Sequence, residues 1–214
     1  MAKYILAHDV GTSGNKAVLV DTEGHVHGKS FEPYRVCYPR PDRAEQEPED
    51  WWKAVTRTTR LLLEKTGVSP ADVLCMTFSA QLLGIVPMDS KTGPLRPAII
   101  WLDNRACNQA NRVMRKFAGP RLFAFIAGTA LCGKDGIPKL LWLKEEEPDI
   151  YRKMSCFLDV GGYLIYRCTG NIVMEWTGAS VFGLDLKQKR WLSGIFRYVG
   201  LDPAKFPPLV RPID

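Results

Sequence analysis

Apolar residues occur in short runs at the start of the chain and recur at helical spacing further along. Residues 4–7 and 17–20 are rich in large aliphatic side chains and bounded by turn residues, which predicts two buried strands. A third strand is expected over 25–34, followed by a loop. Apolar residues then recur at helical spacing between Pro48 and Gly67, where proline suits the first turn and glycine closes the helix.

The remainder of the chain alternates between the two kinds of element. The same criteria predict further strands over 73–79, 85–88 and 98–101. They predict further helices over 103–118, 139–147, 161–169 and 191–199. Antiparallel strands followed by alternating helices and strands indicate an α/β domain with a mixed sheet, with helices added in the second half.

Composition is that of an ordinary soluble globular protein. The chain has 214 residues, 46% hydrophobic and 24% charged, enough to bury a sizeable core in one large domain or two small ones. No apolar stretch reaches the roughly 20 residues that a membrane span needs, and the first residues do not have a signal-peptide layout. We therefore expect a cytoplasmic protein without a membrane partner.

Cysteine, histidine and net charge point to no metal or nucleic-acid site. The six cysteines form no Cys-x-x-Cys pair and have no histidine at zinc-ligand spacing, so we expect small, buried, apolar cysteines. His8 alternates with Asp9 along the first strand, which favours a buried, hydrogen-bonded histidine. The net charge of +6 is scattered rather than gathered into a stripe with aromatic residues, which favours a solvated surface over a nucleic-acid partner.

The turn between the first two strands carries residues suited to phosphate. Gly11 and Gly14 lack a Cβ where the backbone turns or approaches a ligand. Asp9, at the end of the first strand, is placed to orient a hydrated divalent cation. Further donors and positive charge come from Thr12, Ser13 and Lys16. A plain β-hairpin whose polar residues only satisfy turn geometry is an equal alternative on the turn alone, because neither standard nucleotide-binding glycine motif is present.

Several separated segments resemble the FGGY carbohydrate kinases, specifically their N-terminal domain in the xylulose kinase branch. They lie at 9–16, 44–52, 79–84, 96–105, 138–143 and 201–209, in the family's order. The resemblance covers nearly the whole chain. It implies a ribonuclease H-like fold of the actin/hexokinase type, with nucleotide held in a cleft between two domains.

The resemblance also implies an activity, an ATP-dependent phosphorylation of a hydroxyl on a pentulose or related sugar or polyol. ATP and Mg²⁺ are the implied cofactors, and the sugar and ATP the implied partners. Asp9 would hold magnesium through water, while Thr12 and the amides from Gly11 to Gly14 would approach the transferred phosphate. This favours the phosphate reading of the turn over the plain hairpin.

On the sugar side, the resemblance makes Gln81, Asp103 and Arg105 candidate binding residues, with Trp101 as an apolar wall. Arg105 is left open, because it has alternative roles as a partner of Asp103 or a surface charge. Xylulose kinases usually read Gln-Met-His where this chain has Gln81, Leu82 and Leu83. Because this histidine is missing, the candidate substrates are a pentulose, another ketose, a polyol or a sugar acid. Glycerol kinases have an Arg-Glu pair at this loop, and its absence here disfavours glycerol as the substrate.

Residues 1–214 are expected to form only the N-terminal domain of such a kinase. In the family, the catalytic aspartate and the glycine-rich adenosine-binding segment lie beyond the point that corresponds to Asp214. We therefore assign no catalytic base within the chain and expect it to be inactive alone. A non-catalytic sugar-binding or regulatory module is the alternative, and a homodimer is left open.

Overall fold

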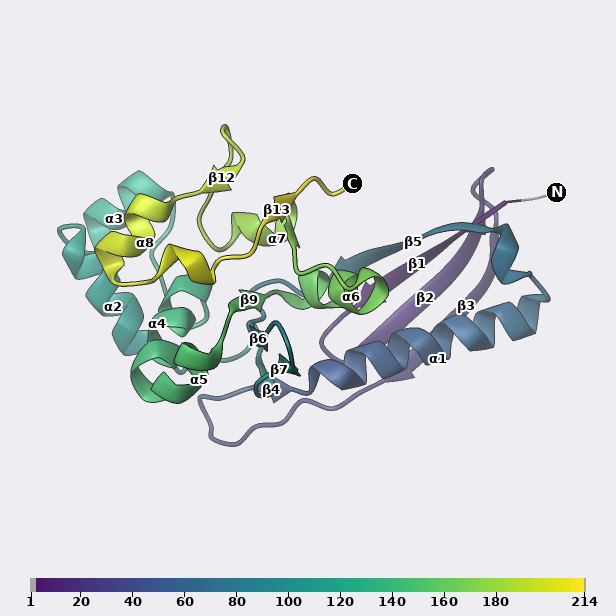
Figure 1. Ribbon diagram of the computed structural model, residues 1–214, viewed down its shortest axis with the longest axis horizontal. Helices are drawn as coiled ribbons and strands as arrows, with labels where there is room; N and C mark the ends of the chain where they lie inside the picture. The colour runs from purple at the N-terminus through teal and green to yellow at the C-terminus, as the bar shows by residue number, and fades with distance from the viewer. Residues whose placement is uncertain (1–2, 214) are drawn as a thin grey trace. The chain divides into compact units, whose positions relative to one another are not determined.

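The computed structural model describes residues 3–213, and the chain divides into two compact units (Figure 1). Unit 1 comprises Met1–Val36 and Glu47–Gln81, and unit 2 comprises Cys37–Gln46 and Leu82–Asp214. No helix within the described residues has both the length and the apolar character needed to cross a membrane.

Unit 1 is a four-stranded mixed sheet with the strand order β3-β2-β1-β5. Its strands are β1 (Tyr4–Val10), β2 (Gly14–Asp21), β3 (Val26–Pro33) and β5 (Val73–Ala80). The first three pair in antiparallel fashion, whereas β5 runs parallel to β1 after the short 3-10 helix η1 (Pro70–Asp72). The predicted opening strands and mixed sheet are therefore confirmed, with β1 and β2 longer than the apolar runs that predicted them and β3 slightly shorter than predicted.

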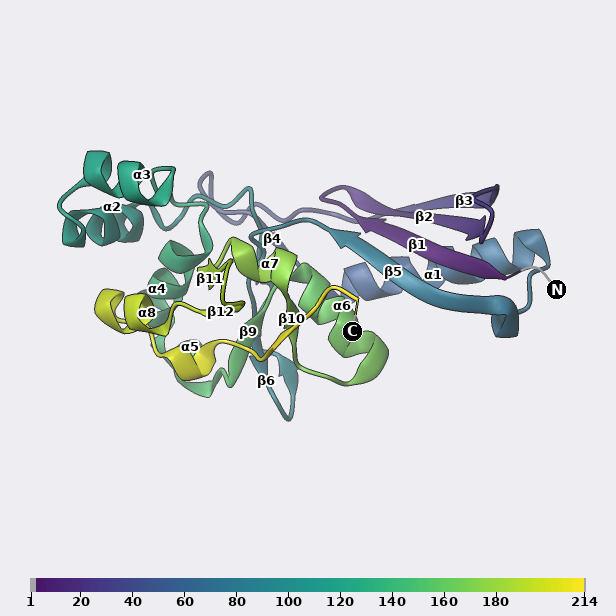
Figure 2. The ribbon, with the colours of Figure 1, turned by 90° about the horizontal axis from the view of Figure 1, so that it is seen from above.

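Helix α1 (Pro48–Thr66) packs against β2 and β3 on one face of this sheet (Figure 1 and Figure 2). Pro48 occupies the first turn, where a missing N–H costs nothing. Gly67 ends the helix in the left-handed region at φ 68°, and its N–H donates to Leu63 O at 2.9 Å. The helix contributes Leu62 to a small core that also contains Leu6, Ala17 and Leu19.

A buried polar layer connects this sheet with α1. Asn15 Nδ2 donates to His8 Nδ1 at 3.0 Å and to Thr58 Oγ1 at 2.8 Å, while His8 Nε2 lies 3.3 Å from Thr59 Oγ1. Burial lowers the pKa of His8 to about 4, against a smaller opposing effect of the Asn15 hydrogen bond. The predicted buried, hydrogen-bonded His8 is confirmed.

Unit 2 combines short strand pairs with helices. Its main sheet has the order β7-β6-β9, formed by Gly93–Pro94, Val86–Asp89 and Cys156–Leu158. The other pairs are β4 (Glu45–Gln46) with β8 (Ala98–Ile99), β10 (Met174–Glu175) with β13 (Leu209–Val210), and β11 (Leu184–Asp185) with β12 (Arg190–Trp191). The helices are α2 (Cys107–Lys116), α3 (Pro120–Ala127), α4 (Gly136–Glu146), α5 (Pro148–Lys153), α6 (Val160–Thr169), α7 (Trp176–Ser180), α8 (Ser193–Val199) and the 3-10 helix η2 (Pro203–Lys205).

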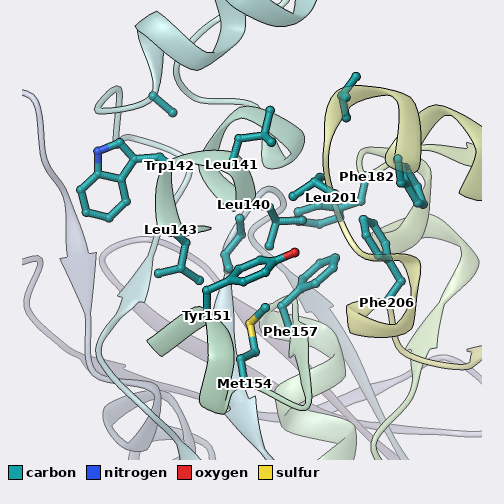
Figure 3. Packing of buried hydrophobic residues seen from close by; sticks show 14 of the residues in the cluster. Leu140, Leu141, Trp142, Leu143, Tyr151, Met154, Phe157, Phe182, Leu201 and Phe206 are labelled. Atoms are coloured by element: carbon teal, nitrogen blue, oxygen red, sulfur yellow. The ribbon is translucent and has the colours of Figure 1, made fainter. Parts of the chain in front are cut away.

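The core of unit 2 is built around α4 and a set of aromatic side chains. Figure 3 shows Leu140 and Leu143 of α4 beside Tyr151 and Phe157. Other members of the core include Met154, Phe182, Phe196, Leu201 and Phe206. The Phe196 and Phe206 rings stack with centroids 3.9 Å apart. Each such buried side chain contributes roughly 1.5–3 kcal/mol, so this core fixes the position of α4.

Some predicted boundaries in unit 2 are wrong. The strand expected over 98–101 is limited to Ala98–Ile99, and the helix expected from Asp103 begins only at Cys107. The reason is that the Asp103 side chain accepts hydrogen bonds from Ala44 N and Arg105 N, which holds residues 103–105 in a non-helical turn. Residues 45–46, expected in a loop, pair with β8.

The expectation of buried cysteines is also wrong. Cys156, in β9, is buried, whereas the exposed cysteines are Cys37, Cys75, Cys107, Cys132 and Cys168. Two of these, Cys107 and Cys168, lie on outward positions of α2 and α6, where a thiol meets water. Composition alone could not distinguish a core thiol from one on the surface of a helix.

Candidate functional site

In unit 1, the turn that joins β1 to β2 is held from three directions. Gly11 N donates to Gly14 O at 3.1 Å, which closes the turn. The carbonyl of Gly11 accepts a hydrogen bond from Tyr34 Oη at 2.5 Å and one from Gln81 Nε2 at 3.4 Å. Tyr34 N also donates to Ser13 O at 3.2 Å. The residues that follow β3 and β5 therefore fix the backbone of the predicted phosphate turn.

Asp9 presents a carboxylate to water beside this turn. It lies opposite Lys16 in the antiparallel pairing, with Lys16 Nζ 3.6 Å from Asp9 Oδ2. The two side chains are 56% and 69% exposed, so the ion pair contributes little to stability. Burial, reinforced by the charge of Asp9, raises the pKa of Tyr34, which keeps its hydroxyl a donor to Gly11 O. Asp9 thus has the exposure that a hydrated cation needs.

The two glycines of the turn have different explanations. A Cβ on Gly14 would lie 2.5 Å from the Phe31 ring and 2.6 Å from Glu32 O, so packing requires glycine there. A Cβ on Gly11 would meet Gly14 O at an ordinary 3.6 Å, and Gly11 has no positive φ. Neither packing nor backbone conformation therefore requires Gly11. The open space over it leaves room for a ligand atom to approach the backbone.

The turn therefore carries chemical groups of the kinds that bind phosphate and a hydrated cation. An exposed carboxylate, an open glycine and a nearby lysine are the groups that phosphate and hydrated magnesium require. Among residues 3–213 there is no cluster of three or more His, Cys, Asp or Glu side chains arranged to hold a metal ion.

In unit 2, the loop Leu82–Gly84 has a constrained backbone. Leu83 lies in the left-handed region at φ 61°. This conformation is unfavourable in free energy for any residue that has a Cβ. A Cβ on Gly84 would lie 2.8 Å from Val160 Cγ2, so the loop passes close to the start of α6. Leu82, by contrast, is 42% exposed. The loop therefore presents Leu82 outward from a backbone that its surroundings hold in place.

Asp103 and Arg105 form a buried ion pair. Arg105 Nη2 lies 2.7 Å from Asp103 Oδ2, and Arg105 Nε lies 2.9 Å from both carboxylate oxygens. Ala44 N donates to Asp103 Oδ2 at 2.7 Å. Burial alone lowers the pKa of Arg105, but its hydrogen bonds to Asp103 and Glu45 outweigh this and raise it. In this conformation both oxygens of Asp103 have partners within the protein.

Glu45 extends this ion pair into a network. Its Oε1 accepts from Arg105 Nη2 at 2.6 Å and also from Arg96 Nη2, while Arg96 Nε lies 3.0 Å from Glu147 Oε2. The Arg105 guanidinium stacks over the Trp142 ring of α4, 4.7 Å from its centroid. The network therefore holds the segment of β4 against the turn that carries Asp103.

Trp101 is the exposed aromatic residue of the predicted sugar-side set. Its side chain is 39% exposed, and Lys134 Nζ lies over its ring, 5.9 Å from the centroid. Lys134 comes from the loop before α4 and forms no ion pair with a described residue. An aromatic face beside an ammonium group is suited to a polar ligand with an apolar side, and more so to an anionic one.

The structure therefore sorts the predicted residues into two groups. Unit 1 brings Asp9, Gly11, Thr12, Ser13, Lys16 and Gln81 around one turn. Unit 2 exposes Leu82 and Trp101, and buries the charges of Asp103 and Arg105. Residues not predicted as part of the site are Glu45, Trp142 and Lys139. Lys139 carried a signal in the sequence, because it is a charged residue directly before the apolar run 140–143.

A hollow lies elsewhere, around the start of α8. It measures about 540 Å³ and is lined by Arg190, Trp191, Leu192, Ser193, Gly194 and Ile195. None of the predicted site residues lines it, and one short segment forms its whole wall. We therefore base no function on it.

Comparison with a family model covers almost the whole chain. The family model described as "FGGY family of carbohydrate kinases, N-terminal domain" matches residues 4–212. The chain belongs to this family, as its sequence pattern predicted.

Curated relatives include sugar kinases with two kinds of substrate in their names. The chain is 32% identical over 213 residues to the xylulose kinase of Bacillus subtilis (strain 168), covering 99% of this chain and 42% of the relative. It is 27% identical over 211 residues to the gluconokinase of the same organism, covering 98% of this chain and 40% of the relative. The chain thus spans about two fifths of the length of these relatives.

Solved structures establish the fold. The crystal structure of a xylulose kinase from Brucella ovis (printed as "xyloylose kinase") superposes with a TM-score of 0.87 at 29% identity, covering 96% of this chain and 42% of that one. Ligand-bound xylulose kinase from Lactobacillus acidophilus gives a TM-score of 0.88 at 24% identity, covering 99% and 43%. The fold is that of the actin/hexokinase-like sugar kinases, as predicted.

Proposed function

We propose that this protein is the sugar-binding, N-terminal part of an ATP-dependent kinase that phosphorylates a hydroxyl of a pentulose or related sugar. The observation that carries the proposal is the turn at 11–14. Its backbone is fixed by Tyr34 and Gln81, an exposed Asp9 lies beside it, and the space over Gly11 is open. Membership of a carbohydrate kinase family supports this reading.

In this proposal, MgATP supplies the phosphoryl group that is transferred. Asp9 would hold the hydrated cation through water, while Gly11, Thr12 and Ser13 would lie along the phosphate. The positive charge of Lys16 would offset negative charge on the phosphate oxygens. No residue of the chain is assigned as the base that takes the hydroxyl proton; the family resemblance places that aspartate beyond Asp214.

For the sugar, we propose direct contacts from Gln81 and from the exposed side chains of Leu82 and Trp101, with Leu83 shaping the loop. Asp103 and Arg105 would act chiefly by holding their turn in place, because their charged groups are buried and bonded to each other. Loss of either charge would leave its partner unpaired, which is costly in a buried position.

A sugar acid is the second candidate substrate, and one observation favours it. Lys134 has no carboxylate partner among the described residues and lies over Trp101, where it can pair with a substrate carboxylate. The gluconokinase relatives are consistent with such a substrate. Leu83, in place of the histidine usual in xylulose kinases, likewise argues against a contact specific to xylulose.

The test is a substrate panel on the complete gene product, with ADP release coupled to a spectroscopic signal. Xylulose, other ketoses, polyols and gluconate are compared, with Lys134→Ala as the matched variant. A pentulose kinase turns over ketoses and is insensitive to this substitution, whereas a sugar acid kinase loses affinity for gluconate in the variant. Sugar binding by calorimetry without turnover on any sugar would contradict the kinase proposal and support a non-catalytic sugar-binding module.

A further inference from the structure

Lys139, at the first turn of α4, is a fully buried lysine. Its Nζ donates to Ile100 O at 2.8 Å and to Leu83 O at 3.1 Å. Among residues 3–213, no carboxylate forms an ion pair with it. Burial lowers the pKa of Lys139 to about 8, although the charges of Asp103 and Asp135 oppose this. Burying an ammonium group that contacts carbonyl groups and no carboxylate costs free energy of folding, so a lysine at this position needs an explanation.

The two carbonyl groups belong to the two segments that carry the exposed residues of the sugar side. Leu83, whose carbonyl accepts one of these bonds, directly follows the exposed Leu82 in the chain. Ile100, whose carbonyl accepts the other, directly precedes the exposed Trp101. Ile100 O also accepts the N–H of Asp103 at 3.1 Å. One side chain thus connects the loop at 82–84, the turn at 100–103 and helix α4.

The backbone conformation of the two segments that Lys139 contacts depends on neighbouring interactions. Leu83 has the left-handed φ of 61°, which persists only where neighbouring contacts outweigh its cost. The bridge between Ile85 and Ile99, with N···O distances of 2.9 and 3.0 Å, aligns the two segments just beyond the lysine. Lys139 adds two side-chain contacts to this main-chain bridge.

We propose that Lys139 is a positioning residue that sets the placement of Leu82 relative to Trp101, and so the shape of the sugar-binding surface of unit 2. It acts through two main-chain carbonyls and does not itself touch the sugar. This inference rests on the proposed function for its consequence, the effect on sugar affinity. The structural part of the inference is that one ammonium group orders two segments of the chain. This ordering can be measured without any sugar.

The alternative is that Lys139 is a general support of the core. Helix α4 offers a matched control, because exposed Lys144 also donates to a main-chain carbonyl, Gly200 O, at 2.6 Å. Lys139→Met and Lys144→Met therefore each remove one lysine from the same helix and one set of carbonyl contacts. Only Lys139→Met affects the loop at 82–84 and the turn at 100–103.

The first measurement is amide hydrogen exchange on the protein without ligand. For Lys139→Met we expect exchange at Ile85, Ile99 and Asp103 to rise at least about tenfold, with the protection of α1 and α8 unchanged. Lys144→Met should leave these three amides as in the wild type. A uniform loss of protection across unit 2, or none at the three amides, would overturn the proposal.

The second measurement is turnover of the complete gene product with an accepted sugar. Lys139→Met should raise the sugar KM about tenfold while KM for ATP stays within about twofold, and Lys144→Met should change neither. Lys139→Gln keeps donor hydrogens, so its sugar KM should rise less than that of Lys139→Met. If Lys139→Met does not fold, Lys139→Gln is measured in its place. An unchanged sugar KM in both Lys139 variants would contradict the positioning role. Absence of sugar binding in the wild type would instead refute the proposed function, leaving hydrogen exchange to decide the positioning role.

Discussion

At the scale of single residues, neighbouring positions of one turn serve packing and ligand binding separately. A Cβ at Gly14 would overlap the Phe31 ring and Glu32 O, whereas one at Gly11 would enter open space. Gly14→Ala should therefore destabilise the protein by about 1–3 kcal/mol. Gly11→Ala should leave the free energy of unfolding unchanged or raise it by up to about 1 kcal/mol, because alanine restricts the unfolded chain.

The functional half of this comparison is measured in the complete gene product. Gly11→Ala should weaken ATP binding about tenfold, or about 1.4 kcal/mol, because the added methyl group occupies the space for phosphate. Urea unfolding gives the stability of both variants, and calorimetry gives the affinity. If Gly11→Ala binds ATP as tightly as the wild type, the turn is a hairpin with no phosphate role.

Asp9 permits a second comparison at this scale. Asp9→Asn removes the charge that would orient hydrated magnesium, so kcat should fall at least about tenfold, or roughly 1.4 kcal/mol of barrier. Stability should change by less than about 0.5 kcal/mol, because the carboxylate is exposed and only loosely paired with Lys16. Lys16→Met, compared by urea unfolding only, controls for the effect of losing the ion pair on stability. A collapse of sugar affinity with unchanged turnover would contradict the magnesium role.

Alternation with Asp9 within one strand was enough to predict that His8 is buried, and the structure confirms this. The environment of Asp103 could not be predicted in the same way. Its partners include Ala44 N, 59 positions earlier in the chain. A local sequence pattern cannot predict a contact between residues so far apart in the sequence. Lys139 was unassigned for the same reason, because its role depends on carbonyl groups 39 and 56 positions away.

At the scale of elements, the contact between β1, β2 and α1 contains a titrating group. Since the pKa of His8 is about 4 when folded and about 6.5 when unfolded, the unfolded chain binds more protons between these values. Stability from His8 is therefore fully present above pH 6.5 and is lost as pH falls towards 4, by up to about 3 kcal/mol. Buried Asp159 acts in the opposite direction, because burial raises its pKa to about 6.

The contribution of His8 can be isolated by subtraction. Urea unfolding of the wild type and of His8→Asn at pH 7, 5.5 and 4.5 should show a stability difference that shrinks as pH falls. The titrations of Asp159 and other groups are common to both proteins and cancel. A difference independent of pH would mean that the pKa of His8 is the same in the folded and the unfolded protein.

Elements with a strong periodic signal were predicted well, and those set by distant contacts were not. Helix α1 was predicted nearly to its ends, because Pro48 and Gly67 mark both of them locally. The two-residue strand β4 was expected in a loop, and it exists because Glu45 pairs with Ile99 of β8, where a longer strand was expected. The start of α2 was placed too early, because an ion pair in the preceding turn overrides helical spacing.

At the scale of the whole molecule, the family relation and the assigned roles have different foundations. The match over residues 4–212 and the superposition on a xylulose kinase at 29% identity establish the family and the fold. The chain nevertheless covers about two fifths of the length of its relatives, so the roles assigned in catalysis are proposals. The phosphate turn of unit 1 can be tested through ATP binding, and the proposed sugar contacts, which include Gln81 of unit 1, through sugar binding.

The final prediction concerns the 214 residues by themselves. Because we assign neither the base nor the adenosine-binding segment within them, the purified chain should show no sugar-dependent ADP release above background. The proposed sugar contacts lie within the chain, so calorimetry should still detect binding of an accepted sugar, weakened by Gln81→Ala by about 0.5–1.5 kcal/mol. The complete gene product, assayed in parallel, controls for an unsuitable sugar. Phosphorylated product from the chain alone would mean that the base lies within residues 1–214.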